Sequence, residues 1–383
     1  MNREDLSIRS CGAKSPAIGV LAIGEPHQLL HVLGPAAELS RAGLDVCILV
    51  TTDWHEAIIA RFAPDAGLRI KRLIGWRRGG AIGDKIRRKW TLYANLLTLR
   101  RFDILLTPEM TSSILRERRL FGGMMVHVMH GAGDREVEGN ERARHFDLVL
   151  VAGEKTRAQL IALDHVRPET CVVAGYPKFD LIDGRRMHFF DDTLPVVLYN
   201  PHFRDDLSSW PAMGAALVRA FAEGAEFNLI VAPHIRLSGA MRAEVAALAA
   251  GPLPANIRVD PGSLHSITMD YTNAADIYLG DVSSQVYEFL RRPRPCVFLD
   301  PNQTDWQDNA FYRHWAFGRV ATSVGQAMDL LRSAVTDHAD HRAAQVAGFD
   351  QSICAAGAAS ARIARAVLAA HARRHGLPAP VGA

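Results

Sequence analysis

Short apolar runs alternate with segments of helical periodicity along most of this chain, and this alternation constrains the fold more than any other feature. The runs in the first part are AIGVLAI (17–23), LDVCILVTT (44–52), FDILLTP (102–108), MMVHVMHG (124–131), FDLVLVAG (146–153) and TCVVAGYP (170–177). Short apolar runs bounded by turn residues are typical of strands buried on both faces. When such strands alternate with helices, they form a parallel sheet covered by helices on both sides. We therefore predict an α/β protein.

A second series of the same kind begins near residue 194, with LPVVLYNPHFR, FNLIVAPHIR, ADIYLGDVSS and PCVFLD. The polar, turn-rich segment GRRMHFFDDT (184–193) separates the two series. We expect an N-terminal Rossmann-like domain over residues 1–188 and a C-terminal Rossmann-like domain over 189–350, facing each other across a cleft. The segment 351–383 holds an alanine-rich helix, from about Asp350 to Arg374, and a tail. This helix is expected to pack back on the first domain.

Composition limits the partners and the location. The formal charge is only +3, and there is neither zinc-finger spacing nor a basic tail, so we expect no nucleic acid. No apolar stretch has the length of a membrane span or a signal peptide. The five cysteines are scattered and never form a C-x-x-C pair, which fits reduced thiols. We expect a cytoplasmic protein, at most held on the inner face of a membrane.

Several catalytic signatures are absent from the sequence. There is no G-x-S-x-G, no G-x-x-x-x-G-K-[ST], no H-E-x-x-H and no D-x-D. The first strand-to-helix junction, AIGEP, lacks the G-x-G-x-x-G pattern of nicotinamide binding. We therefore expect no metal site and no cofactor. Any phosphate chemistry then depends on histidine, arginine, hydroxyl groups and helix ends.

The stretch GDVSSQVYEFL (280–290) places an acid and two adjacent hydroxyls between an apolar strand and a helix. Free backbone N–H groups at such a junction, together with small hydroxyls, form a natural phosphate site. Capping of the helix by a serine is the alternative, but it does not explain Glu288. We expect Asp281, Ser283 and Ser284 to bind a donor diphosphate and Glu288 to reach ribose hydroxyls.

His130 follows the strand MMVHVM and precedes GAGD. A glycine at that point lets the backbone turn and leaves the imidazole at the carboxyl end of the strand, which suits a general base. A surface histidine is the alternative. We place Gly131 and Asp134 on the acceptor side of the same site.

Two further strand ends repeat a proline–histidine pair with an arginine two residues on, in NPHFR and APHIR. These motifs contain His202 with Arg204, and His234 with Arg236. Arginine is always charged and forks onto phosphate oxygens, so both tips suit an anionic ligand. Parallel strands send their carboxyl ends to one edge, so we expect both tips to lie near the serine pair.

The segment KRLIGWRRGGAIGDKIRRKW (71–90) has eight basic residues, one acid and a tryptophan near each end. Basic clusters with tryptophan suit an anionic bilayer surface. A solvated loop, or a groove for an anionic acceptor, explains the same composition. The sequence leaves these three readings open.

The ordered motifs resemble the CDP-glycerol glycerophosphotransferase family, whose members build teichoic-acid-like and capsular polymers on a GT-B fold. The resemblance runs from about residue 100 to 330 through HG at His130, GYPKFD, NPHFR, APHIR, GDVSSQVYEFL and PCVFLD. It implies that His130 is the base, that His234 contacts the donor phosphates, and that Ser283 and Ser284 bind the pyrophosphate. Residues 1–100 look more like a nucleotide-sugar enzyme.

The function expected from this resemblance is transfer of a polyol phosphate from a CDP-activated donor to a glycan or lipid-linked acceptor hydroxyl, without metal. His130 deprotonates the acceptor, while His234, Arg236 and the serine pair stabilise the departing CMP. One alternative is a GT-B glycosyltransferase or UDP-sugar 2-epimerase acting on a nucleotide sugar. Another is a nucleotide-binding protein without turnover. The released nucleotide separates these readings.

Overall fold

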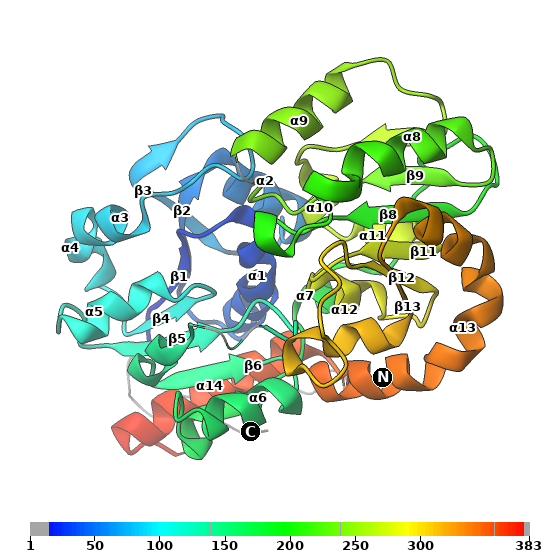
Figure 1. Cartoon of the computed structure of the whole chain (residues 1–383). Helices are drawn as coiled ribbons and strands as arrows, with labels where there is room; N and C mark the ends of the chain where they lie inside the picture. The colour runs from blue at the N-terminus through cyan, green and yellow to red at the C-terminus, as the bar shows by residue number, and fades with distance from the viewer. Residues whose placement is uncertain (1–14, 136, 138, 238, 356, 379–383) are drawn as a thin grey trace.

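The computed structural model describes residues 15–135, 137, 139–237, 239–355 and 357–378. It has two parallel sheets, each covered by helices, and Figure 1 shows them as two lobes side by side. We call the lobe built on β1–β7 the first lobe and the lobe built on β8–β13 the second. The predicted α/β class with two Rossmann-like sheets is confirmed.

The sheet of the first lobe has the strand order β3-β2-β1-β4-β5-β6-β7, and all its pairings are parallel. Its central strands are short runs of branched and unbranched aliphatic residues that are buried on both faces, which is why they carry no polar alternation. The strands are β1 (Ile18–Ala22), β2 (Val46–Thr52), β3 (Arg69–Arg77), β4 (Ile104–Thr107), β5 (Met124–Val128), β6 (Leu148–Val151) and β7 (Cys171–Val173).

The sheet of the second lobe has the order β10-β9-β8-β11-β12-β13 and is also parallel throughout. In both sheets the strand order reverses beside the first strand, at β1 and at β8, and ligands of open α/β sheets bind at such switch points. The strands are β8 (Val196–Asn200), β9 (Asn228–Val231), β10 (Ile257–Val259), β11 (Ile277–Gly280), β12 (Cys296–Leu299) and β13 (Arg319–Ala321).

Helices cover the faces of both sheets. Those of the first lobe are α1 (Pro26–Arg41), α2 (Asp53–Phe62), α3 (Arg88–Ala94), α4 (Leu96–Leu99), α5 (Ile114–Glu117), α6 (Glu154–Ala162) and α7 (Lys178–Leu181). Those that follow are α8 (Ala215–Glu223), α9 (Gly239–Ala250), α10 (Leu264–Ile267), α11 (Asp270–Ala274), α12 (Gln285–Phe289), α13 (Val324–Ser352) and α14 (Ala359–His375). Short 3-10 segments lie at Thr111–Ser113, Glu141–His145, Pro168–Thr170, Asp205–Leu207 and Ala310–Phe317, and a π-helical turn at Trp210–Gly214.

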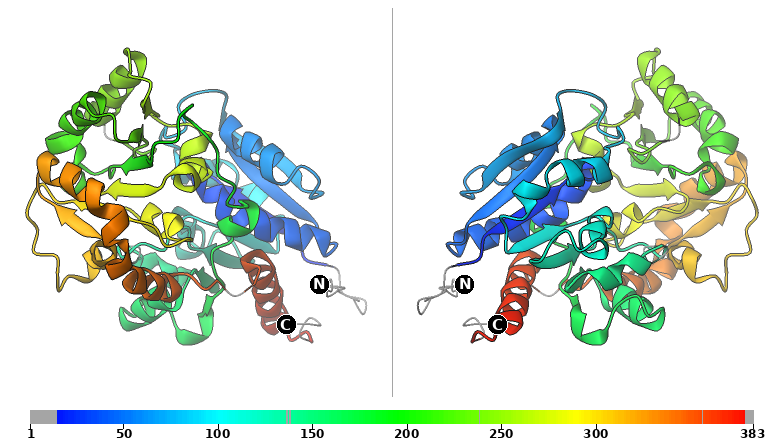
Figure 2. Two further views of the ribbon diagram at one scale, coloured as in Figure 1. Left: turned by 90° about the vertical axis from the view of Figure 1, so that its right-hand side faces the viewer. Right: turned by 90° about the vertical axis from the view of Figure 1, so that its left-hand side faces the viewer.

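The C-terminal helix differs from the prediction in its start. Asp350 belongs to α13, which begins in the second lobe, and Ile353 ends that helix in an extended conformation. The following α14 packs against α1 of the first lobe, as predicted. Figures 1 and 2 show α13 in orange leaving the second lobe and α14 in red lying against the first. The predicted domain boundary at 188/189 falls between the last strand of one sheet, β7, and the first of the other, β8.

Candidate active site

A cavity of about 360 Å³ lies between the lobes and is lined by loops that follow the carboxyl ends of their strands. We call it the histidine cavity, because six histidines line it. It brings together nearly all the candidate residues from both halves of the sequence. Those among its lining residues are His130, Gly131, Asp134, His202, Arg204, His234, Arg236, Ser283, Ser284 and Glu288.

The hydrogen bonds of His130 fix which ring nitrogen faces the cavity as an acceptor. Its Nδ1 lies 2.8 Å from the carbonyl oxygen of Pro108, so Nδ1 carries the proton and donates it there. In the neutral ring, Nε2 then keeps its lone pair. The side-chain amide of Gln28 donates to this nitrogen at 3.2 Å. The tautomer is therefore that of a general base.

His202 and His234 have the opposite arrangement, and they share it. The backbone N–H of Arg204 donates to Nδ1 of His202, and that of Arg236 donates to Nδ1 of His234, each at 3.1 Å. Because Nδ1 accepts in both rings, the proton of the neutral imidazole lies on Nε2. The two proline–histidine tips thus each supply an N–H donor, which suits a phosphate oxygen.

The electrostatic surroundings keep these donor rings neutral. Burial, with the nearby Arg204, lowers the pKa of His202 to about 4. Burial, with Arg236 and the neighbouring histidines, lowers the pKa of His234 well below its ordinary value. Both rings are therefore uncharged near pH 7 and donate as neutral groups.

Three histidines of the cavity, His27, His31 and His314, were missed by the sequence analysis. His27 and His31 lie one turn apart at the start of α1, directly after β1. The ring of His27 contacts those of His130 and His234, with centroid distances of 5.8 and 5.7 Å. Burial lowers the pKa of both His27 and His31 well below the ordinary value. A signal existed in the pattern HQLLH after a strand, since residues four apart share a helix face.

Asp281 does not line the cavity, so its predicted contact with phosphate needs correction. Its side chain is buried and accepts hydrogen bonds from the backbone N–H of His202 at 2.8 Å and from the N–H and hydroxyl of Ser209 at 2.6 and 2.9 Å. Burial raises the pKa of Asp281 to about 6, against these hydrogen bonds. Its role is to hold the loop that carries His202.

The serine junction lines the cavity, but the helix after it is short. Ser283 and Ser284 precede α12, which has five residues, so its dipole is small. The hydroxyl of Ser283 accepts from the backbone N–H of Gln285 at 3.3 Å, as the capping alternative requires. Ser284 is exposed and has no such bond. Of the two, Ser284 is therefore the hydroxyl open to a ligand.

Glu288 has partners other than the expected ribose. Its carboxylate accepts from Nζ of Lys178 at 2.7 and 2.9 Å and from the hydroxyl of Tyr176 at 2.7 Å. Both partners come from the first lobe, in GYPKFD, so these bonds join the two lobes. Glu288 also lines the histidine cavity, and its contact with ribose stays a prediction.

Asp134 lines the histidine cavity and also joins the lobes, and its place on the acceptor side stays a prediction. It accepts from the backbone N–H of His314 at 2.8 Å, from the hydroxyl of Tyr287 at 2.6 Å and from Nζ of Lys155 at 2.8 Å. Burial alone would raise the pKa of Asp134, but the bonds from His314 and Lys155 lower it well below its usual range. The carboxylate is a fixed anion that supports the loop after His130.

The two arginines of the tips differ. Arg204 lines the histidine cavity and forms an exposed ion pair with Asp206 of its own lobe. Arg236 stacks on the ring of Phe203 at 4.3 Å and lies 3.7 Å from the carboxylate of Glu25, which belongs to the first lobe. Arg236 is therefore the cation of the pair that faces both lobes.

Within the described part of the chain, no group of three or more His, Cys, Asp or Glu side chains is arranged to hold a metal ion. In the same ranges, no helix combines the length and the apolarity that a membrane span needs.

Two parallel sheets facing each other, with the site between their strand ends, define a GT-B protein, as predicted. The chain belongs to the CDP-Glycerol:Poly(glycerophosphate) glycerophosphotransferase family, whose sequence profile matches residues 122–369. The resemblance found in the sequence is thereby confirmed, and with it the transferase class. None of the curated proteins compared with the chain matches it.

Solved structures share the fold. A structure of the wall teichoic acid polymerase TagF is 12% identical, with a TM-score of 0.63 over 97% of this chain and 91% of that one. A UDP-N-acetylglucosamine 2-epimerase is 13% identical, with a TM-score of 0.61 over 96% and 99%. The calicheamicin glycosyltransferase CalG4 is 14% identical, with a TM-score of 0.54 over 94% and 100%. At such identities the likeness concerns the fold alone.

Proposed function

We propose that this chain transfers glycerol phosphate from CDP-glycerol to a hydroxyl group of a cell-wall polymer or its lipid-linked primer, with His130 as the general base. The acceptor hydroxyl gives its proton to Nε2 of His130, and its oxygen bonds to the β-phosphorus of the donor. The bond from that phosphorus to the bridging oxygen breaks, and CMP leaves with the electron pair. The observation that carries the proposal is the Nδ1–H bond from His130 to Pro108, which leaves Nε2 as an acceptor.

Charge that develops on the donor phosphates is stabilised by neutral donors in this proposal. The Nε2–H groups of His202 and His234 and the hydroxyl of Ser284 supply them, and Arg236 adds a cation. Preorganised donors of this kind are often the largest catalytic contribution. Because protein groups supply this stabilisation, we expect the rate to be unchanged after EDTA treatment and dialysis, and a lost rate that Mg²⁺ restores would refute that part.

The test is a pair of measurements on His130→Ala, with His188→Ala as the control because His188 is exposed and lies outside the cavity. Loss of a general base lowers kcat by about 10²–10⁴-fold. Calorimetric binding of CDP-glycerol should stay near the wild-type affinity. If His130→Ala keeps its turnover, or loses donor binding in proportion to activity, His130 is not the base.

The purified wild-type protein also distinguishes the proposed function from the alternative functions that the sequence left open. A ligand that binds only the folded state raises the melting temperature. A shift with CDP-glycerol and CMP, and none with UDP-N-acetylglucosamine or UDP, agrees with a cytidine donor. Conversion of UDP-N-acetylglucosamine without any acceptor would instead identify an epimerase, and release of a nucleoside diphosphate would identify a sugar transferase.

We further propose that the first lobe contacts an anionic membrane surface through an apolar patch made of Ile74, Trp90, Tyr93 and Leu97. Their side chains are 59, 52, 43 and 79% exposed. They lie together, because Asn95, between α3 and α4, exchanges two hydrogen bonds with the backbone of Ile74. Exposed aromatic and aliphatic groups beside basic residues suit the headgroup region of a bilayer.

The membrane contact is tested by sedimentation with vesicles of phosphatidylglycerol or of phosphatidylcholine. The wild type should bind the anionic vesicles more strongly, and Trp90→Ser/Leu97→Ser should lose this binding. The matched control is Leu163→Ser, since Leu163 is 51% exposed at the end of α6, outside the patch. Equal binding by the patch variant would refute the contact.

A further inference from the structure

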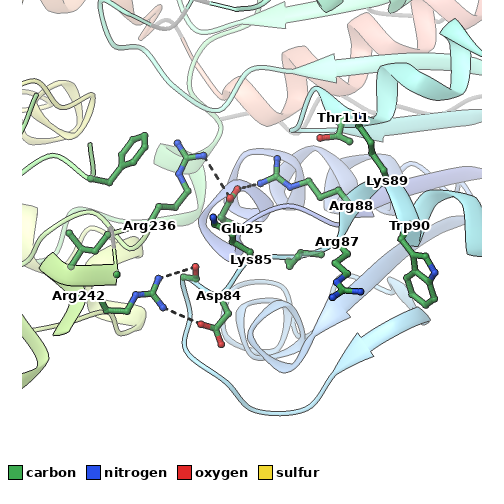
Figure 3. Close-up of a pocket in the computed structure, with 15 residues that line it drawn as sticks. Glu25, Asp84, Lys85, Arg87, Arg88, Lys89, Trp90, Thr111, Arg236 and Arg242 are labelled. Atoms are coloured by element: carbon green, nitrogen blue, oxygen red, sulfur yellow. Dashed lines mark hydrogen bonds and ion pairs between the residues drawn. The ribbon is translucent and has the colours of Figure 1, made fainter. Parts of the chain in front are cut away.

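A second and larger cavity, of about 990 Å³, adjoins the histidine cavity (Figure 3). One side comes from the segment 83–90 of the first lobe, and the other comes from Arg236, Leu237, Gly239 and Arg242 of the second lobe. Phe203 and Arg236 line both cavities, so these side chains form a shared wall. We call this space the basic cavity.

The lining of the basic cavity carries a large excess of positive charge. Six cationic side chains face two carboxylates, those of Glu25 and Asp84. The cations are Lys85, Arg87, Arg88, Lys89, Arg236 and Arg242. A concave surface lined by one sign of charge concentrates counter-ions of the opposite sign.

The two carboxylates are already used to join the lobes. Glu25 pairs with Arg88 of its own lobe and with Arg236 of the other, and Asp84 pairs with Arg242 at 3.1 Å (Figure 3). Two of the three pairs, Glu25 with Arg236 and Asp84 with Arg242, connect the lobes. They also leave none of the acidic lining to neutralise the remaining cations.

Those remaining cations are Lys85, Arg87 and Lys89. Across the residues that the structure describes, their side chains take part in no ion pair and no side-chain hydrogen bond. All three are exposed: Lys85 and Arg87 precede α3, and Lys89 lies in its first turn. Three unpaired cations in one hollow are a site for a ligand that carries more than one negative charge.

The shape of the cavity favours a chain-like anion over a bilayer. A membrane surface does not enter a hollow, and the basic cavity has walls from two lobes. A narrow linear molecule can lie between Arg87 of the first lobe and Arg242 of the second. The volume, about 990 Å³, is at the upper end of the range for ligand sites and exceeds that of a single phosphate group.

We propose that the basic cavity binds phosphate groups of the acceptor, and that it holds them while the acceptor hydroxyl reaches His130 past Phe203 and Arg236. This inference rests on the proposed function. It makes the preferred acceptor an anion, carrying a phosphate monoester or phosphodiester one or more units behind the reacting hydroxyl. A neutral glycoside that lacks those phosphates gains nothing from Lys85, Arg87 and Lys89.

The kinetic test compares two acceptors in the variant Arg87→Gln/Lys89→Gln. One acceptor is a synthetic trimer of glycerol phosphate, and the other is a neutral alkyl glycoside with a free hydroxyl. A charge-assisted hydrogen bond contributes about tenfold or more to affinity, so the KM of the trimer should rise at least tenfold. The KM values of CDP-glycerol and of the neutral acceptor should not change.

The matched control is Arg118→Gln, because Arg118 is an exposed cation of the same lobe outside both cavities. It should leave every constant unchanged. An unchanged KM for the trimer in the double variant, or an equal loss with the neutral acceptor, would overturn the inference. Loss of vesicle binding with an unchanged KM would assign the two cations to the bilayer and overturn it too.

A binding measurement separates this inference from the proposed function. Calorimetry of the glycerol phosphate trimer, without donor, should show binding to the wild type that Arg87→Gln/Lys89→Gln weakens at least tenfold and that rising salt weakens further. If the wild type shows this binding but transfers nothing from CDP-glycerol, the proposed reaction fails while the anion site stands. If the wild type does not bind the trimer, the site itself is refuted.

Discussion

The ion pair between Lys178 and Glu288 is buried at the boundary of the two lobes. Its contribution to the free energy of unfolding should be measurable with single and double variants. The two side chains are 5 and 8% exposed, and both carboxylate oxygens accept from Nζ, at 2.7 and 2.9 Å. Without the lysine, the carboxylate keeps a single neutral donor, the hydroxyl of Tyr176. Removing one partner of a buried pair leaves an uncompensated charge and costs about 3–5 kcal/mol.

We therefore predict that Lys178→Met lowers the free energy of unfolding by about 3–5 kcal/mol. The double variant Lys178→Met/Glu288→Met should recover most of that loss, because an apolar replacement of a whole buried pair is often neutral. The control is Arg332→Met. Arg332 and its partner Glu226 are 49 and 50% exposed, so this change should leave the free energy of unfolding close to that of the wild type.

The assay is urea unfolding followed by tryptophan fluorescence and circular dichroism, with the m-value compared between variants. Coincident curves from the two probes show that the lobes unfold together. The reasoning is refuted if Lys178→Met costs less than about 1 kcal/mol, or if the double variant is as unstable as the single one.

Two further predictions concern the buried histidines and the serine junction. The free energy of unfolding should fall from pH 7 to pH 5. Burial lowers the pKa of several histidines, that of His127 to about 3, so these rings stay neutral in the folded protein. In the unfolded chain they take up protons below about pH 6.5, which favours the unfolded state. Asp281, with its pKa raised to about 6, acts with the opposite sign but is a single group; a urea midpoint that rises toward pH 5 would contradict this balance. Separately, Gly133→Ala should raise the Kd for CDP-glycerol, because its Cβ would lie 2.9 Å from Cβ of Ser284 and displace the serine junction. Gly122→Ala, with no atom within 4 Å of the added Cβ, should bind the donor like the wild type in the same calorimetric titration.

The strands of both sheets followed from sequence because each central strand is an unbroken apolar run between turn residues. The exception is β3, which the sequence analysis read only as part of a basic stretch. Four of its residues, Arg69, Lys71, Arg72 and Arg77, are charged, and the strand lies at the sheet edge with most side chains exposed. An edge strand needs no second apolar face, and charge there discourages pairing with another chain.

The histidine tips also followed from sequence, because parallel strands deliver their carboxyl ends to one edge. The roles of three carboxylates did not. Asp134 accepts a hydrogen bond from a residue that lies 180 positions away in the chain. The corresponding separations are 79 positions for Asp281 and 110 positions for Glu288. Their neighbours in sequence give no sign of those partners, so the sequence analysis did not predict that these carboxylates hold loops and lobes together. His27 and His31 were missed because the sequence of their helix, α1, has the pattern of an ordinary apolar helix.

Because α14 packs on α1, the first lobe is completed only after the last helix of the chain has been synthesised. Ser360, at the start of α14, donates its backbone N–H to Asp180 at 2.6 Å, and Arg374 near its end pairs with Asp147 at 2.9 Å. At about 5–20 residues per second, a ribosome delivers α14 on the order of 15–60 s after α1. During that interval the apolar face of α1 lacks its cover. In a nascent chain, the part of α1 that α14 covers therefore stays exposed until the end of synthesis, as an apolar surface that a chaperone could bind.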